Sequence, residues 1–161
     1  PHIWVSPAVV RSFVPAIATA LRTLLPADAA AITANETRLL AAIDVLDQDV
    51  KRILAAASGN RFYVFHPAWG YFARDYGLVQ IAIEEDSKEP SPARLARLIG
   101  AARAEGTQAI FVQPQVSERS AEVVAGEIGA KLVAIDPLAR DWPAGIRAAA
   151  EAIAAAATRA P

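Results

Sequence analysis

Four short apolar runs alternate with helix-forming segments after residue 58, and this alternation constrains the fold more than any other feature. Strands separated by helices favour βαβ units and a parallel sheet. The chain is therefore expected to be an α/β protein with a four-stranded, mostly parallel sheet flanked by helices and preceded by a long connecting helix. The expected strands are 61–65, 78–83, 109–113 and 131–135, and the expected helices between and after them are 68–76, 91–105, 117–128 and 142–158.

Two further helices are predicted before the first strand. Ser6-Pro7 is a helix start, with Ser as N-cap and Pro at the first helical position, and Pro15 is expected to kink or restart this helix, which runs over 8–25. The second helix, 29–57, would be about 40 Å long. That length favours a strut between two lobes, and a coiled-coil partner helix is the alternative. Its narrow apolar stripe consists of Leu39, Ile43, Leu46, Val50 and Ile53.

Composition and missing motifs exclude several classes of function. Sixteen basic residues oppose 17 acidic ones, for a net charge of −1. The chain has no excess of basic residues to neutralise phosphates, which argues against nucleic-acid binding. The absence of cysteine excludes disulfides, thiolate metal sites and cysteine nucleophiles. No phosphate-binding glycine loop and no Gly-x-Ser-x-Gly elbow is found, and no apolar run reaches the roughly 18 residues of a membrane span. An enzyme is therefore not expected.

The chemistry of the chain is expected at the carboxyl ends of the strands, where open parallel sheets bind ligands. His66, Gln113 and Asp136 follow three of the predicted strands, and the other histidine, His2, lies near the N-terminus. Imidazole and carboxylate are suitable zinc ligands. A structural role is the alternative for each: His66 as a helix cap, Asp136 as the start of a turn, Gln113 in a loop. The acidic run 84–89 is interpreted as a solvated loop.

Several motifs make the chain similar to a known family. Pro-His-Ile-Trp opens the sequence at 1–4, Phe-His-Pro-Ala-Trp-Gly-Tyr-Phe-Ala occupies 65–73, and Glu-Pro-Ser-Pro occupies 89–92. Two strand ends, 109–115 and 133–138, complete the set. In this order and spacing they resemble the zinc-type solute-binding proteins of metal-uptake ABC transporters, the cluster A-I receptors. One departure is Pro67, where the family usually has Asp.

The resemblance implies two α/β lobes joined by one rigid helix, with a metal between the lobes. Residues 1–28 would be the remnant of an N-terminal lobe, 29–57 the connecting helix and 58–161 the C-terminal lobe. The chain is accordingly expected to be the C-terminal portion of a longer receptor. The N-terminal lobe segment missing from it would be a partner of this portion.

The resemblance also implies a metal site formed by His2, His66 and Asp136, with a further histidine from the missing segment. Asp136 is the ligand that some zinc-type members replace with water. His at position 66 is the zinc-type pattern, so Zn²⁺ is expected as the transported ligand, with Mn²⁺ or other divalent ions less favoured.

The implied function is that of a high-affinity zinc receptor, periplasmic or extracytoplasmic, which delivers Zn²⁺ to the membrane permease of an ABC importer. The alternative is a metal-free α/β interaction domain, or a receiver-like one. Such a domain would use the stripe of its long helix to bind a partner or a second copy.

Overall fold

A sheet of four parallel strands forms the centre of the α/β part of the protein. The strands are β1 (Arg61–Val64), β2 (Val79–Ala82), β3 (Ala109–Val112) and β4 (Lys131–Ala134), in the order β2-β1-β3-β4. Every pair is parallel, which confirms the predicted fold class. The computed structural model describes residues 2–57, 60–85, 88, 90–114 and 119–156.

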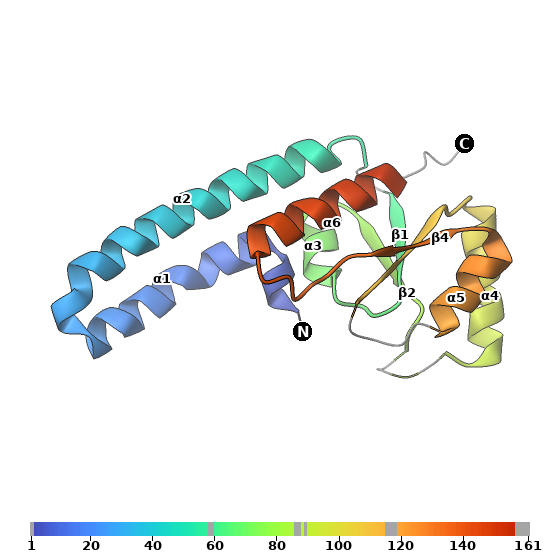
Figure 1. The fold of residues 1–161 in the computed structure, drawn as a ribbon, viewed down its shortest axis with the longest axis horizontal. Coiled ribbons are helices and arrows are strands. Elements are labelled where there is room, and N and C mark those ends of the chain that lie inside the picture. Colours follow the sequence, from blue (N-terminus) through green and yellow to red (C-terminus); the bar gives the residue numbers. More distant parts are fainter. Residues whose placement is uncertain (1, 58–59, 86–87, 89, 115–118, 157–161) are drawn as a thin grey trace.

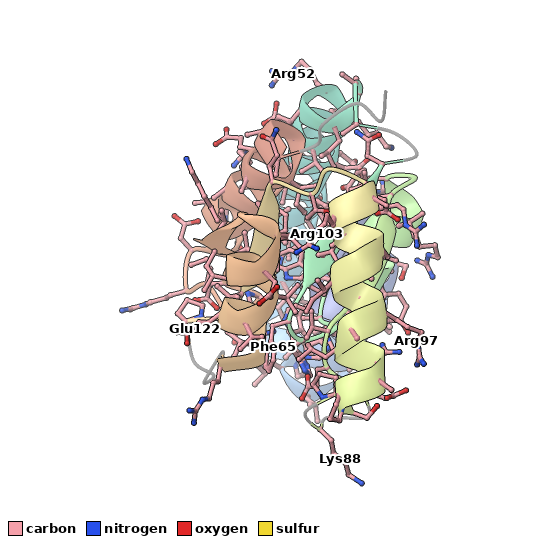
Figure 2. The ribbon with its side chains drawn as sticks, turned by 90° about the vertical axis from the view of Figure 1, so that its right-hand side faces the viewer. Arg52, Phe65, Lys88, Arg97, Arg103 and Glu122 are labelled. Atoms are coloured by element: carbon pink, nitrogen blue, oxygen red, sulfur yellow. The ribbon has the colours of Figure 1, made fainter. Side chains whose placement is uncertain are left out.

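Helices cover both faces of this sheet. On one face lie α4 (Pro92–Ala104) and α5 (Arg119–Ile128), side by side as in Figure 2. On the other lie α3 (Gly70–Asp75) and α6 (Trp142–Ala156) (Figure 1). The expected starts and ends at 117–118 and 157–158 fall outside the described residues.

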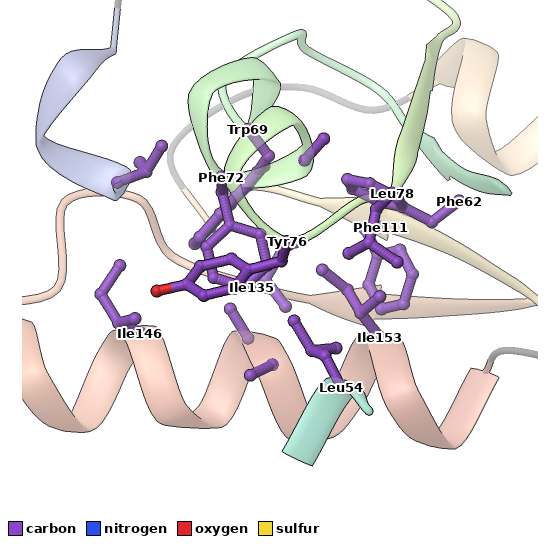
Figure 3. Close-up of a cluster of buried hydrophobic side chains, with 14 of the residues drawn as sticks. Leu54, Phe62, Trp69, Phe72, Tyr76, Leu78, Phe111, Ile135, Ile146 and Ile153 are labelled. Carbon is purple, nitrogen blue, oxygen red and sulfur yellow. The ribbon is translucent and has the colours of Figure 1, made fainter. Parts of the chain in front are cut away.

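Alternate residues of the central strands fill two separate cores. Phe62 and Val64 of β1 belong to the cluster on the α6 side, shown in Figure 3, together with Trp69, Phe72 and other large apolar side chains. Tyr63 belongs to the cluster beneath α4 and α5. Because both faces of β1 are buried, its register with the neighbouring strands is strongly specified.

Two long helices form a hairpin that projects from this α/β part (Figure 1). They are α1 (Pro7–Leu24) and α2 (Ala29–Leu54), joined by the 3-10 turn η2 (Pro26–Asp28). Pro15 lies inside α1, which does not restart there. No helix in the described ranges is both long and apolar enough to cross a membrane.

Most of the apolar stripe of α2 is part of the core. Ile43, Leu46 and Val50 are each at most 1% exposed, while Leu39, in the N-terminal half of α2, is 46% exposed. Leu46 and Val50 pack into the α6-side cluster. Ile43, Leu46 and Val50 are therefore unavailable to a partner helix, and the alternative function that depended on the stripe is not favoured.

Polar contacts also fix α2 to the α/β part. The hydroxyl of Tyr76 donates to Oδ1 of Asp47 at 2.9 Å, and Nε of Arg147 on α6 donates to Oδ2 of Asp49 at 3.0 Å. These contacts connect one long helix to both α3 and α6. The C-terminal half of α2 is thus held to the α/β part by apolar packing and by hydrogen bonds.

Replacing Ser6, the N-cap of α1, is expected to destabilise the protein. Ser6 is fully buried, its Oγ accepts from the Val9 amide at 3.1 Å, and it donates to the carboxylate of Asp75, the last residue of α3. Ser6→Ala should lower the free energy of unfolding by about 1–2 kcal/mol, measured by urea denaturation.

Ser12→Ala is the matched control. Ser12 is exposed and its hydroxyl donates only to the Val9 carbonyl within the same helix. Its loss should change stability by less than about 0.5 kcal/mol. Equal effects of the two substitutions would contradict the role assigned to Ser6.

Candidate metal site

His66 lies at the carboxyl end of β1, as the sequence predicted. The ladder continues one residue past the strand, because the amide of Phe65 donates to the Phe111 carbonyl at 2.8 Å. The His66 side chain, 24% exposed, follows directly. Its own carbonyl accepts from the Ala68 amide at 2.8 Å, which turns the chain toward α3.

His2 meets His66 although the two are far apart in sequence. Their ring centroids are 5.1 Å apart with an interplanar angle of 78°. Both rings line a surface pocket of about 400 Å³. The other residues around this pocket are Pro67, Ala68, Gly70, Tyr71 and Arg74.

The segment that carries His2 is fixed by two tryptophans. Trp4 lies in the 3-10 turn η1 (Ile3–Val5), and its Nε1 donates to the Pro137 carbonyl at 2.9 Å. Nε1 of Trp142, the first residue of α6, donates to the Trp4 carbonyl at 2.7 Å. Val5, fully buried, anchors the same turn in the core. The position of His2 therefore depends on contacts with the opposite end of the sequence.

The environment of His2 favours its neutral form. Burial, and then the neighbouring His66 ring, lower the pKa of the His2 imidazole below its usual value. A neutral imidazole has a free nitrogen lone pair, which is the form that coordinates a metal. Both effects therefore favour metal coordination by His2 at neutral pH.

A positive side chain stands at the rim of this pocket. The guanidinium of Arg74 lies over the Tyr71 ring, 5.1 Å from its centroid. Its Nε donates to Oδ1 of Asp75 at 2.7 Å, so a carboxylate partly offsets the charge. Arg74 therefore opposes a bound cation less than an unpaired arginine would.

Asp136 lies at the same edge of the sheet but does not line the pocket. β1 pairs with β3, and β3 pairs with β4. If both registers continue past the strand ends, His66 lies in one row with Gln113 and Ile135. Asp136 is the residue after Ile135. Oδ1 of Asp136 accepts from the Leu138 amide at 2.8 Å. Within the described residues no three histidines or carboxylates stand close enough to hold a metal ion. Asp136 as a ligand remains a prediction.

Sequence reasoning missed the part that Glu84 plays. Its carboxylate contacts Nδ1 of His66, and its side chain is 13% exposed, so it is not the solvated loop residue expected. The sequence shows that Glu84 is the first residue after the second predicted strand. That this strand lies beside the one that leads to His66 is a property of the folded sheet. The amide nitrogen Nε2 of Gln113 is also buried at this edge, with no hydrogen-bond partner in the described part of the chain.

Comparison with known proteins identifies the family of the chain. A family model described as ZnuA, the periplasmic component A of the zinc-uptake complex, matches residues 1–156. The chain belongs to the ZnuA family. A crystal structure of ZnuA superimposes with a TM-score of 0.95 at 42% identity, covering 98% of this chain and 62% of that one. A zinc-bound deletion mutant of ZnuA superimposes with a TM-score of 0.93 at 42% identity, covering 100% of this chain and 62% of that one.

Curated relatives extend well beyond the matched region. ZnuA of Paracoccus denitrificans is 34% identical over 85% of this chain and 43% of its own length. The zinc-binding protein AdcA of Streptococcus pyogenes is 33% identical over 86% of this chain and 27% of its own length. A putative metal-binding protein of Chlamydia muridarum is 31% identical over 95% of this chain and 56% of its own length. The chain thus spans between about a quarter and a little over half of these relatives.

Removing the indole donor of Trp4 is expected to loosen the segment that carries His2. Trp4→Phe keeps an aromatic ring but loses the hydrogen bond from the indole nitrogen to the Pro137 carbonyl, which is worth about 1 kcal/mol. Amide hydrogen exchange over residues 2–6 should become several-fold faster, as read by mass spectrometry. Leu138→Ala, a change at a 62% exposed side chain of the same loop, should leave that exchange rate unchanged. Identical rates in Trp4→Phe and the unaltered protein would show that the indole bond does not hold the segment.

Proposed function

We propose that this chain is the C-terminal portion of a high-affinity zinc receptor outside the cytoplasm, which delivers Zn²⁺ to the membrane permease of an ABC importer. The observation that carries the proposal is the meeting of His2 and His66 in one pocket of a ZnuA-family fold. The zinc-bound ZnuA structure supports the choice of metal. In this role the protein binds and releases an ion and performs no covalent chemistry.

Two imidazoles alone do not complete a zinc site. Zinc in proteins is bound mostly by four ligands in tetrahedral arrangement, at about 2.0–2.1 Å from each histidine nitrogen. His2 and His66 supply two nitrogens, and Asp136 supplies an oxygen if its loop moves toward them. The remaining ligand comes from the N-terminal lobe segment that the chain lacks. Two nitrogen donors favour Zn²⁺ over Mn²⁺, which prefers oxygen ligands.

The exposed side of the α1–α2 hairpin supports the same division into lobes. An apolar groove of about 190 Å³ lies between these helices, lined by residues that include Ile17, Leu21 and Leu39. These three side chains are 41–51% exposed. Contiguous exposed apolar grooves commonly mark a surface that binds another protein segment, a ligand or a membrane. We assign residues 1–28 to the N-terminal lobe, 29–57 to the connecting helix and 58–161 to the C-terminal lobe, with the missing segment seated on this groove.

Loss of His66 is the direct test of the proposal. In the full-length receptor, His66→Ala should weaken zinc binding on the order of 100-fold or more, because one of about four ligands is lost. The measurement is competition against a chromophoric chelator. Gln108→Ala, an exposed change at the opposite edge of the sheet, is the control. Unchanged affinity in His66→Ala would contradict the assignment.

To test whether Asp136 is a zinc ligand, the substitution must keep its hydrogen bond with the Leu138 amide. Asp136→Asn retains an oxygen that accepts from the Leu138 amide but loses the charge. If Asp136 coordinates zinc, affinity should fall about tenfold or more. Asp141→Asn is matched to it, because Oδ1 of Asp141 likewise accepts a backbone amide, that of Ala144, at 3.1 Å. Equal affinities for both variants would remove Asp136 from the ligand set.

A further inference from the structure

We propose that Glu84 is a positioning residue for His66: its carboxylate accepts the Nδ1 proton and so presents Nε2 of His66 to the metal. This inference rests on the proposed zinc function and names a residue outside the predicted ligand set. It starts from the contact between Nδ1 of His66 and Oε2 of Glu84.

Strand register places the two side chains next to each other. β1 and β2 pair in parallel from Arg61 opposite Val79 to Val64 opposite Ala82, a constant offset of 18 positions. The ladder continues past the strands, because the amide of Ile83 donates to the Val64 carbonyl at 2.9 Å, and the next amide, that of Glu84, donates to the Phe65 carbonyl at 3.0 Å. The same offset sets His66 opposite Glu84. Paired residues on neighbouring strands point to the same face, so their contact is a property of the sheet.

The contact decides which ring nitrogen remains available. A carboxylate accepts hydrogen bonds and donates none when ionised, so the imidazole nitrogen facing it carries the proton. Nδ1 of His66 is therefore N–H, and Nε2 keeps its lone pair. Nε2 has no hydrogen-bond partner in the described part of the chain, and the ring lines the pocket shared with His2. A metal bound by His66 would therefore be coordinated by Nε2.

Glu84 acts through His66 and not as a ligand itself. It is absent from the residues that line the pocket, whereas His66 lines it. A carboxylate behind a metal-binding histidine fixes the tautomer and the ring orientation and makes the coordinating nitrogen more basic. Loss of such a partner typically weakens metal binding 10- to 100-fold.

The tautomer can be measured without metal. In the metal-free full-length receptor at about pH 8, two-bond ¹H–¹⁵N spectra should show His66 with Nδ1 protonated. Glu84→Leu should shift His66 toward the Nε2–H tautomer and lower zinc affinity about 10- to 100-fold. Glu84→Gln retains an acceptor oxygen without the charge, so it should keep the Nδ1–H tautomer and lose less affinity than Glu84→Leu.

Glu85→Gln is the matched control, because Glu85 is the next residue and its side chain is 54% exposed. It should leave both the tautomer and the affinity unchanged. An Nε2–H tautomer in the unaltered protein would overturn the proposal, as would unchanged tautomer and affinity in Glu84→Leu. If Glu84→Leu does not fold, Glu84→Gln decides: reduced affinity supports the proposal, and full affinity overturns it.

The two proposals fail in distinguishable ways. If the unaltered receptor binds no zinc, the zinc function fails, and the tautomer measurement still reports whether Glu84 sets the protonation of His66. If zinc binds tightly and Glu84 variants match Glu85→Gln, only the positioning role is lost.

Discussion

The parallel pairing of β1 with its two neighbours decides where the functional groups of this chain lie. Because all four strands run the same way, the residues that follow them share one edge of the sheet. The register sets His66 opposite Glu84 on one side and opposite Gln113 on the other. A slip of one residue would turn His66 to the opposite face, toward α4 and α5. The two cores prevent that slip, since Phe62 and Tyr63 are buried on opposite faces.

The second half of the site has a different origin. His2 reaches the pocket because Trp4 is bonded both to the loop after β4 and to the first residue of α6. These are contacts between the two ends of the sequence, so His2 is in place only when the whole chain is folded. A metal that binds both histidines would therefore stabilise the folded state, because the unfolded chain cannot bring them together.

Local signals predicted most of the fold. Short apolar runs located the four strands, and Ser-Pro pairs located the starts of α1 and α4, where Ser6 and Ser91 each accept a backbone amide. What depends on long-range packing was not predictable. The α2 stripe has the same spacing whether it faces a partner helix or its own core, and the packing of α2 against α1 and α6 decides between them. Glu84 belongs to an acidic run, and nothing local distinguishes the one carboxylate that register places against His66.

The two imidazoles of the pocket are held by different contacts. His66 is held by the sheet and by Glu84, and His2 is held by the contacts of Trp4. On the proposed function, the remaining ligand belongs to the lobe that covers the α1–α2 groove. Each ligand contributes to affinity only while its own support is intact. On the same proposed function, a change that displaced the N-terminal segment would remove one nitrogen ligand and leave His66 in place, because His66 is held by the sheet and by Glu84.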